Sequence, residues 1–225
     1  YAIIEARGNL YCTKGSKIVV MDTGNLQIKD SIPVGKSPEK IYYDSVFNRI
    51  YSLNTGDSTM SIIDLQDYSV NEVGLAYEPS ALVMTSRKIY VSTYSGNKVF
   101  MLNRENCSIM NSIEINGCPC DLVFANGKIY VACAGESTVA VIDTNLIFLT
   151  QIDVGKGPVS LVYNPFAEKI YVANFGGGAD STVSIIATNY EVTSVTTGYG
   201  PYKLLYDPGG NLIYVINLMD TTYCT

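Results

Sequence analysis

The segment KIYVACAGESTVAVIDT, Lys128 to Thr144, returns in altered form about forty residues later as KIYVANFGGGADSTVSIIAT, Lys169 to Thr188. Both copies open on a Lys-Ile-Tyr-Val run and contain a second run that starts with Ser-Thr-Val. Each run alternates β-branched or aromatic residues with small or polar ones, which is typical of short strands. The recurrence indicates a strand-based unit that the chain uses more than once.

The same unit recurs along the whole chain. A tyrosine preceded by an aliphatic residue returns at steps of 40, 39, 40, 41 and 43 residues, and a proline that follows a turn keeps a similar spacing. The tyrosines are Tyr11, Tyr51, Tyr90, Tyr130, Tyr171 and Tyr214. The prolines are Pro38, Pro79, Pro119, Pro158 and Pro201. A period of about forty residues is typical of an array of supersecondary units.

The fourth unit shows what one repeat contains. Its four strand-like runs are 120–125, 128–134, 138–144 and 148–154. Asn126-Gly127 matches a two-residue hairpin turn, in which both central residues need positive φ. No segment of ten or more residues has helical periodicity, so the sequence predicts an all-β fold. Four antiparallel strands per forty residues predict a β-propeller of four-stranded blades.

We predict one propeller domain over residues 1–225, with five complete blades and a half blade. The predicted blades are 1–36, 37–76, 77–116, 117–156, 157–199 and the partial 200–225. The last unit holds two strands, 202–207 and 211–218, and residues 1–7 read as the innermost strand of the first blade. An uncovered apolar edge strand is an aggregation hazard. We therefore expect either a longer propeller of six or seven blades, or completion of the half blade by strand addition from a neighbouring subunit.

The tyrosine-centred phrase resembles the YVTN β-propeller repeat family. The phrase reads YVAN at Tyr171 to Asn174 and YVIN at Tyr214 to Asn217, and it is looser in the other units. A second phrase follows it within the repeat and reads STVAVIDT at Ser137 to Thr144 in the fourth unit. The resemblance covers essentially the whole chain and is to the repeats of archaeal surface-layer proteins and secreted bacterial proteins. It implies a propeller fold and a place outside the cell. Similar blades also occur in some periplasmic quinoprotein and haem enzymes, and fold alone does not fix function.

Composition excludes several classes of partner. The net charge is −6 and no basic run is available to follow a phosphate backbone, so nucleic acid is excluded as a partner. The apolar stretches are far shorter than the roughly 20 residues that a membrane-spanning helix needs. The chain has 18 tyrosines but no histidine and no tryptophan. Haem ligation by histidine and stacking of a quinone cofactor on tryptophan are therefore excluded, and the sequence nominates no catalytic, cofactor or metal residue.

The cysteines allow two predicted pairs. Counting outward from the Asn126-Gly127 turn places Cys120 opposite Cys133 on a non-hydrogen-bonded pair, where a disulfide fits. Free buried thiols, or a metal site that adds Cys118, remain open alternatives. Cys12 and Cys224 are a candidate pair that would close the ring. A disulfide would indicate an oxidising compartment, so we expect a secreted chain at the cell surface or outside the cell.

Other candidate positions lie in loops. Asn106 begins an Asn-x-Ser triplet and is a candidate for N-glycosylation. Acidic residues precede Ser-Thr in three units and are interpreted either as turn caps or as calcium ligands; they are Asp57, Glu136 and Asp180. The loop aromatics are candidates for contact with a ligand or protein; they are Tyr94, Phe175, Tyr199 and Tyr202.

Taken alone, the sequence favours a non-catalytic extracellular module of a cell envelope, surface layer or filament, acting through its loop faces and blade edges. A protein partner or self-assembly at the half blade is the expected interaction. The alternative is a propeller domain of a periplasmic or secreted enzyme, redox or lactonase-like, whose catalytic residues the sequence does not identify.

Overall fold

A computed structural model describes residues 2–219, which form five four-stranded antiparallel sheets and one two-stranded sheet. The strands of each sheet follow one another in the chain, so every sheet is a simple meander. The first sheet contains β1 (Ile3–Ala6), β2 (Asn9–Thr13), β3 (Lys17–Asp22) and β4 (Ile28–Pro33). The second contains β5 (Pro38–Asp44), β6 (Arg49–Asn54), β7 (Thr59–Asp64) and β8 (Val70–Gly74). The third contains β9 (Pro79–Met84), β10 (Lys88–Thr93), β11 (Lys98–Asn103) and β12 (Ile109–Glu114).

The remaining sheets repeat this plan. The fourth contains β13 (Pro119–Ala125), β14 (Lys128–Cys133), β15 (Thr138–Asp143) and β16 (Phe148–Asp153). The fifth contains β17 (Pro158–Asn164), β18 (Lys169–Asn174), β19 (Thr182–Ile186) and β20 (Val192–Thr196). The sixth contains β21 (Pro201–Asp207) and β22 (Leu212–Asn217). A single 3₁₀ turn, η1 (Gly176–Gly178), interrupts the loop after β18.

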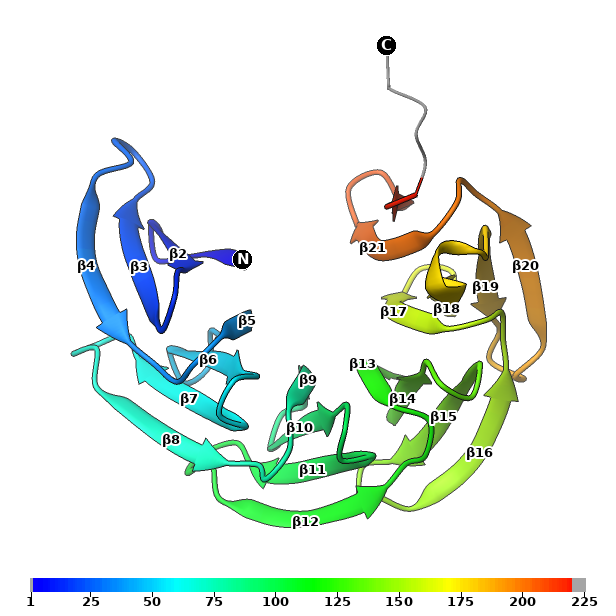
Figure 1. The fold of residues 1–225 in the computed structure, drawn as a ribbon, viewed down its shortest axis with the longest axis horizontal. Coiled ribbons are helices and arrows are strands. Elements are labelled where there is room, and N and C mark those ends of the chain that lie inside the picture. Colours follow the sequence, from blue (N-terminus) through cyan, green and yellow to red (C-terminus); the bar gives the residue numbers. More distant parts are fainter. Residues whose placement is uncertain (1, 220–225) are drawn as a thin grey trace.

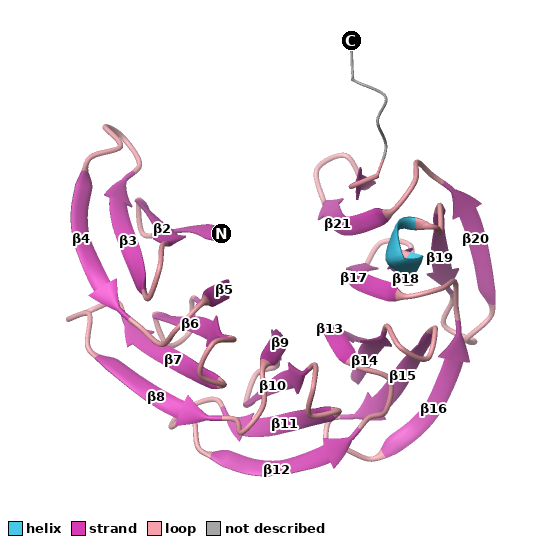
Figure 2. Ribbon diagram, viewed as in Figure 1, coloured by secondary structure: helices cyan, strands magenta, loops and turns pink. Residues whose placement is uncertain are grey.

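The sheets stand around a central channel as blades of an open ring (Figures 1 and 2). The first strand of each sheet lies innermost, and the fourth strands, such as β8, β12 and β16, form the outer rim. The open side of the ring lies between the first sheet and the β21–β22 pair (Figure 1). The predicted all-β propeller, with five complete blades and a half blade, is confirmed. We call the sheets blades 1 to 6 in chain order.

Local backbone chemistry explains the hairpins. Asn126 and Gly127 both have positive φ, 49° and 75°, as the two-residue turn between β13 and β14 requires.

Within residues 2–219 no helix is long and apolar enough to cross a membrane.

The repeated tyrosine forms the core between blades. Tyr11, Tyr51, Tyr90 and Tyr130 are almost fully buried. Tyr11, for example, packs with Ile18 of its own blade and with residues of blade 2. Full burial of such a side chain stabilises the fold by roughly 1.5–3 kcal/mol. The ring is therefore held together by apolar layers between successive blades.

The predicted pairing of Cys120 with Cys133 is wrong in its register. A β-bulge at the start of β13 places Pro119 opposite Cys133 and Asp121 opposite Ala132, so Cys120 has no direct partner. Cys120 packs against the core between blades 4 and 5, whereas Cys133 lies in the core between blades 3 and 4. The two side chains thus leave the sheet on opposite faces, and both thiols are free. The second predicted pair includes Cys224, which lies outside the described residues.

Candidate functional site at the channel mouth

The bulge of the innermost strands recurs around one end of the channel, which we call the channel mouth. Each innermost strand from β5 to β21 starts with a buried proline, and the pairing to its neighbour slips by one residue directly after it. The residue after each proline is partly or fully exposed. These residues are Glu39, Ser80, Cys120, Val159 and Tyr202. Five different side chains therefore meet at one repeat position around the channel.

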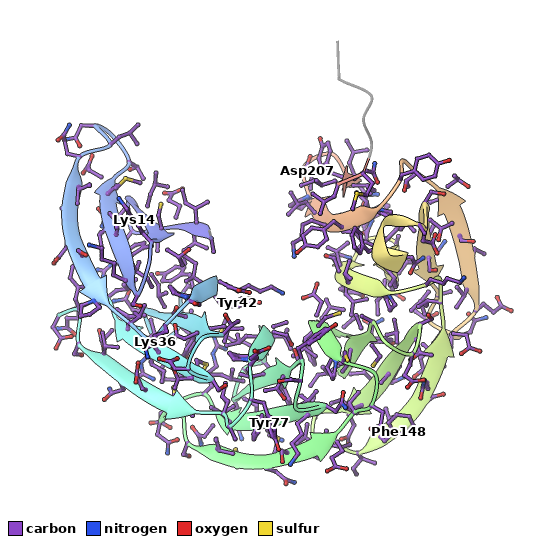
Figure 3. The ribbon with its side chains drawn as sticks, viewed as in Figure 1. Lys14, Lys36, Tyr42, Tyr77, Phe148 and Asp207 are labelled. Carbon is purple, nitrogen blue, oxygen red and sulfur yellow. The ribbon has the colours of Figure 1, made fainter. Side chains whose placement is uncertain are left out.

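Two adjoining cavities lie at the channel mouth. The larger has a volume of about 380 Å³ and is lined by, among others, Glu39, Glu78, Ser80, Tyr94 and Cys120. The smaller has about 270 Å³ and is lined by Ala2, Ile41, Tyr42 and Lys203. Three residues line both cavities, namely Lys40, Val159 and Tyr202. Figure 3 places Tyr42 on the inner side of the ring. A polar ligand of modest size fits this combined space.

Lys40 is the cation at the centre of this arrangement. Its Nζ donates to the backbone oxygen of Cys120 at 3.4 Å, which links blade 2 to blade 4 across the channel. Among the described residues Lys40 takes part in no ion pair. The ammonium group therefore keeps donors for a ligand, while the carboxylates of Glu39 and Glu78 stand at the rim of the same cavity.

Aromatic rings form one wall. The ring of Phe175 meets the ring of Tyr202 edge-on, with 5.7 Å between centroids, and Tyr94 lines the same cavity as Tyr202. Three of the four predicted loop aromatics thus gather near the channel mouth. Tyr199 is 63% exposed and lines neither cavity. Contact of these rings with a ligand stays a prediction.

Hydrogen bonds between blades hold the innermost strands in place. The backbone N–H of Leu82 donates to the Tyr42 hydroxyl at 3.2 Å, and that of Leu161 donates to Asp121 Oδ2 at 2.9 Å. The Ser80 hydroxyl donates to the backbone oxygen of Pro119 at 2.6 Å. Because these bonds are buried or partly buried and join neighbouring blades, they fix the shape of the channel mouth before a ligand arrives.

Protonation limits what Cys120 can do. Burial, together with the nearby Asp121 carboxylate, raises the pKa of the Cys120 thiol to about 12. Its Sγ donates to the backbone oxygen of Pro158 at 3.1 Å. The group is therefore a protonated thiol at neutral pH and is a poor nucleophile. Burial likewise raises the pKa of the Tyr42 hydroxyl, which remains protonated.

The acidic residues before Ser-Thr act mostly as turn caps. Within their own turns, Asp57 Oδ1 accepts from the Thr59 hydroxyl at 2.9 Å, and Asp180 Oδ1 accepts from the backbone N–H of Thr182 at 2.8 Å. The second carboxylate oxygen of each aspartate accepts from a backbone N–H of the preceding loop. Glu136 has no such bond among the described hydrogen bonds. Within residues 2–219, no group of three or more His, Cys, Asp or Glu side chains is arranged to hold a metal ion. The observed contacts of the two aspartates therefore match the capping interpretation.

Sequence reasoning missed Lys40 and Glu78. The repeat places Lys40, Ala81, Asp121, Ser160 and Lys203 at one equivalent position, two residues after the proline. Ala81, Asp121 and Ser160 are buried at this position, whereas Lys40 and Lys203 line the cavities, so the change to lysine is the signal that could have found Lys40. The alignment of the prolines alone does not tell which of these residues faces the channel.

Comparison with known proteins identifies the fold of the chain but assigns it to no family. No protein-family model matches the chain, and no curated protein sequence matches it. The resemblance to the YVTN repeat family is therefore not confirmed by a family model, and the link to archaeal surface-layer proteins is without support.

Solved structures, in contrast, share the shape of the chain. Virginiamycin B lyase from Staphylococcus aureus matches with a TM-score of 0.80 and 12% identity, over 97% of this chain and 84% of the lyase. A putative 6-phosphogluconolactonase from Bacteroides uniformis matches with a TM-score of 0.77 and 14% identity, over 96% of this chain and 77% of that one. Dihydro-heme d1 dehydrogenase NirN matches with a TM-score of 0.76 and 11% identity, over 92% of this chain and 50% of that one.

These likenesses correct the functional prediction. The expectation of a non-catalytic structural module is contradicted, because the similar solved propellers are named as a lyase, a putative 6-phosphogluconolactonase and a dehydrogenase. At such low identity no individual activity passes to this chain by similarity. What the chain shares with these proteins is the β-propeller fold.

Proposed function

We propose that the chain is a propeller domain of an enzyme that acts at the channel mouth on a small polar carbonyl compound, with a sugar lactone as the substrate class. The observation that carries the proposal is the convergence of Lys40, Glu78 and Tyr202, from three different blades, on adjoining cavities. The likeness to a putative 6-phosphogluconolactonase supports the choice of substrate class.

Lactone hydrolysis needs few groups. Water adds to the carbonyl carbon, the ring C–O bond breaks, and the ring oxygen takes a proton to give the hydroxy acid. The Lys40 ammonium group would stabilise the negative charge that develops on the carbonyl oxygen. Because the sequence contains no histidine, a carboxylate such as Glu78 or Glu39 would accept the proton of the attacking water. The ring of Tyr202 would lie against the apolar face of the sugar.

A kinetic assay tests the proposal. Release of acid from 6-phosphogluconolactone is followed by titration at constant pH, against the spontaneous rate. The wild-type protein should accelerate hydrolysis, and Lys40→Met should lower kcat/KM by about a hundredfold, as for loss of other oxyanion-stabilising donors. Lys17→Met, at an exposed position of β3, is the matched control and should have no effect.

Two results would refute the proposal. One is a wild-type rate equal to the spontaneous rate under every condition in which the protein is folded. The other is a Lys40→Met variant as active as the wild type, which would place the reaction away from the channel mouth.

We also propose that this enzyme works outside the cell. Asn106 supports this location, because it lies exposed in the turn between β11 and β12. Its Oδ1 accepts from the backbone N–H of Ser108 at 3.0 Å, which leaves the amide nitrogen free for a glycan. Mass spectrometry of the protein from its native source, before and after glycosidase treatment, tests both the site and the compartment. An unmodified Asn106 in a protein recovered from the cytoplasm would contradict the proposal.

A further inference from the structure

The turn between the third and fourth strands of every complete blade contains a residue with positive φ. Its backbone N–H donates to the carbonyl of the residue that begins the turn. The five residues are Leu26, Tyr68, Cys107, Leu146 and Tyr190, with φ between 57° and 68°. Their φ values are similar, although the turn bond reaches back four residues in blades 1 to 3 and three residues in blades 4 and 5. Their side chains differ widely in size.

These side chains pack against the blade before them. Tyr68, Cys107, Leu146 and Tyr190 each belong to a different core cluster between successive blades. Leu26 of blade 1, with no earlier blade beside it among the described residues, is 62% exposed. Each junction between successive complete blades therefore has an outer slot that the turn residue of the later blade enters.

The junction between blades 4 and 5 shows how a tyrosine fills the slot. Lys128, the first residue of β14, donates from Nζ to the Tyr190 hydroxyl at 2.7 Å. The same Nζ lies 5.0 Å from the centre of the Tyr190 ring. A cation at the start of the second strand thus holds the phenol ring of the following blade in its slot.

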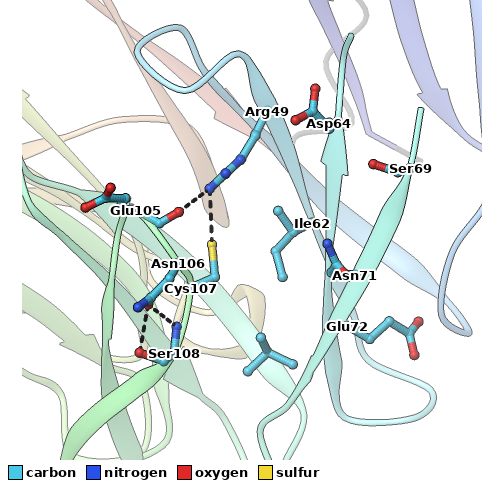
Figure 4. A pocket seen from close by; sticks show the side chains of 11 residues that line it. Arg49, Ile62, Asp64, Ser69, Asn71, Glu72, Glu105, Asn106, Cys107 and Ser108 are labelled. Atoms are coloured by element: carbon cyan, nitrogen blue, oxygen red, sulfur yellow. Dashed lines mark hydrogen bonds between the residues drawn. The ribbon is translucent and has the colours of Figure 1, made fainter. Parts of the chain in front are cut away.

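The junction between blades 2 and 3 has the cation but lacks the ring. Arg49, the first residue of β6, takes the place of Lys128, and Cys107 takes the place of Tyr190. A cavity of about 450 Å³ opens here, and Ile62 and Val73 of blade 2 line it. Figure 4 shows Ile62 across the cavity from Cys107. Nη1 of Arg49 donates to the backbone oxygen of Glu105 at 2.6 Å and lies 3.9 Å from Cys107 Sγ.

We propose that this cavity is a binding site for a phenol ring, supplied either by a small phenolic compound or by a tyrosyl side chain of a peptide. The molecule itself provides the template, because Tyr190 shows the ring and its cation in the equivalent slot. The ligand ring lies against Ile62 and Val73, and its hydroxyl faces the Arg49 guanidinium.

The charged groups that line the cavity favour a neutral phenol over an anionic ligand. Arg49 is the only cation among the residues that line the cavity, whereas Asp64, Glu72 and Glu105 all stand there as carboxylates. A carboxylate or phosphate ligand would meet repulsion from three acidic groups. A phenol offers a π face to the cation and a hydroxyl for hydrogen bonding without adding charge.

The test measures binding of p-cresol to the whole chain by NMR, with methyl signals of Ile62 and Val73 as the reporters. The wild-type protein should show saturable shifts of these methyl groups. Cys107→Tyr should fill the slot with its own ring, weaken p-cresol binding by about tenfold or more and raise the melting temperature. The backbone should accept this residue, because Tyr68 and Tyr190 already have φ of 60° and 68°, against 58° at Cys107.

Cys107→Ser is the control that keeps the slot open, and it should bind p-cresol as the wild type does. Arg49→Met should weaken binding several-fold through loss of the cation. N-acetyltyrosinamide, assayed in parallel, distinguishes the sources: tighter binding of this compound than of p-cresol assigns the slot to a peptide side chain, and the reverse order assigns it to a free phenol. Absence of saturable methyl shifts in the wild type overturns the proposal, as does undiminished binding by a folded Cys107→Tyr variant.

Discussion

Asp44 is 1% exposed at the end of β5, yet it carries a charge. Arg104 from blade 3 donates to both of its carboxylate oxygens, from Nε at 2.7 Å and from Nη2 at 2.6 Å. The backbone N–H groups of Val46 and Phe47 donate to Oδ1. Burial alone would raise the pKa of this carboxyl, but these bonds together hold it below its usual value. A buried charge is tolerated here because every part of it is paired.

Removal of the Arg104 side chain should therefore lower the stability of the fold. We predict that Arg104→Met lowers the free energy of unfolding at pH 7 by about 3–5 kcal/mol, because it leaves the Asp44 carboxylate buried without its partner. Arg87→Met, at an exposed position, is the control and should change stability by less than about 0.5 kcal/mol. Urea denaturation measures both. Equal effects of the two substitutions would contradict the assigned role of the pair.

The stability that the Asp44–Arg104 pair contributes should depend on pH in a defined direction. A carboxyl whose pKa is depressed by folding contributes stability that is present above its unfolded pKa of about 3.9 and is lost as pH falls through the lower folded value. The difference in stability between wild type and Arg104→Met should therefore shrink below about pH 4. A difference that stays constant from pH 7 to pH 3 in urea denaturation would show that Asp44 does not respond to its partner.

Among the elements, the innermost strands show why register could be only partly predicted. The count from the Asn126-Gly127 turn gives the observed pairs as far as Asp121 and Ala132, and fails one residue later at the bulge. Each of these bulges directly follows the recurring proline, which cannot donate a hydrogen bond to the neighbouring strand, and a count outward from the turn takes no account of it. The predicted disulfide depended on that last step of the count.

Thiol labelling tests the corrected register. We predict that iodoacetamide, applied in denaturant without reductant, labels both Cys120 and Cys133, because their side chains lie on opposite faces of blade 4. The same digest after full reduction should give an unchanged pattern for these two peptides. A linked peptide pair that contains both cysteines would contradict the described register.

The fold was far easier to predict than the site. Six copies of one apolar-tyrosine pair at nearly constant spacing fix the strands, because every copy must bury the same face. The site depends instead on residues that differ between copies, such as Lys40 and Tyr202, which only the curvature of the open ring brings together. Repetition reveals architecture, whereas function depends on departures from it.

At the scale of the whole molecule, the two sides of the opening present apolar faces. Tyr214 is 53% exposed, although its counterparts in blades 1 to 4 are buried between blades. Across the opening, Ile3 of blade 1 is 60% exposed, whereas its counterpart in blade 2, Ile41, is buried. Each face is thus one half of an interface like those between successive blades.

A protein partner at this edge stays a prediction. We infer that a second copy of the chain can serve as that partner, because the two apolar faces of the opening complement each other. Wild-type protein should self-associate with rising concentration in sedimentation velocity, and Tyr214→Lys combined with Ile216→Lys should remain monomeric. Val192→Lys combined with Val195→Lys, on the exposed strand β20, is the control and should leave association unchanged. Monomeric wild-type protein at all concentrations would contradict the inference.

The most direct test of the account is a crystal structure of the chain with 6-phosphogluconate, the stable product of lactone hydrolysis. We predict that the product occupies the channel mouth, with an oxygen within hydrogen-bonding distance of Lys40 Nζ and its carbon skeleton against the ring of Tyr202. Occupancy of any other place, or an empty channel mouth at product concentrations that saturate the protein in solution, would contradict the claim that this propeller acts on its substrate there.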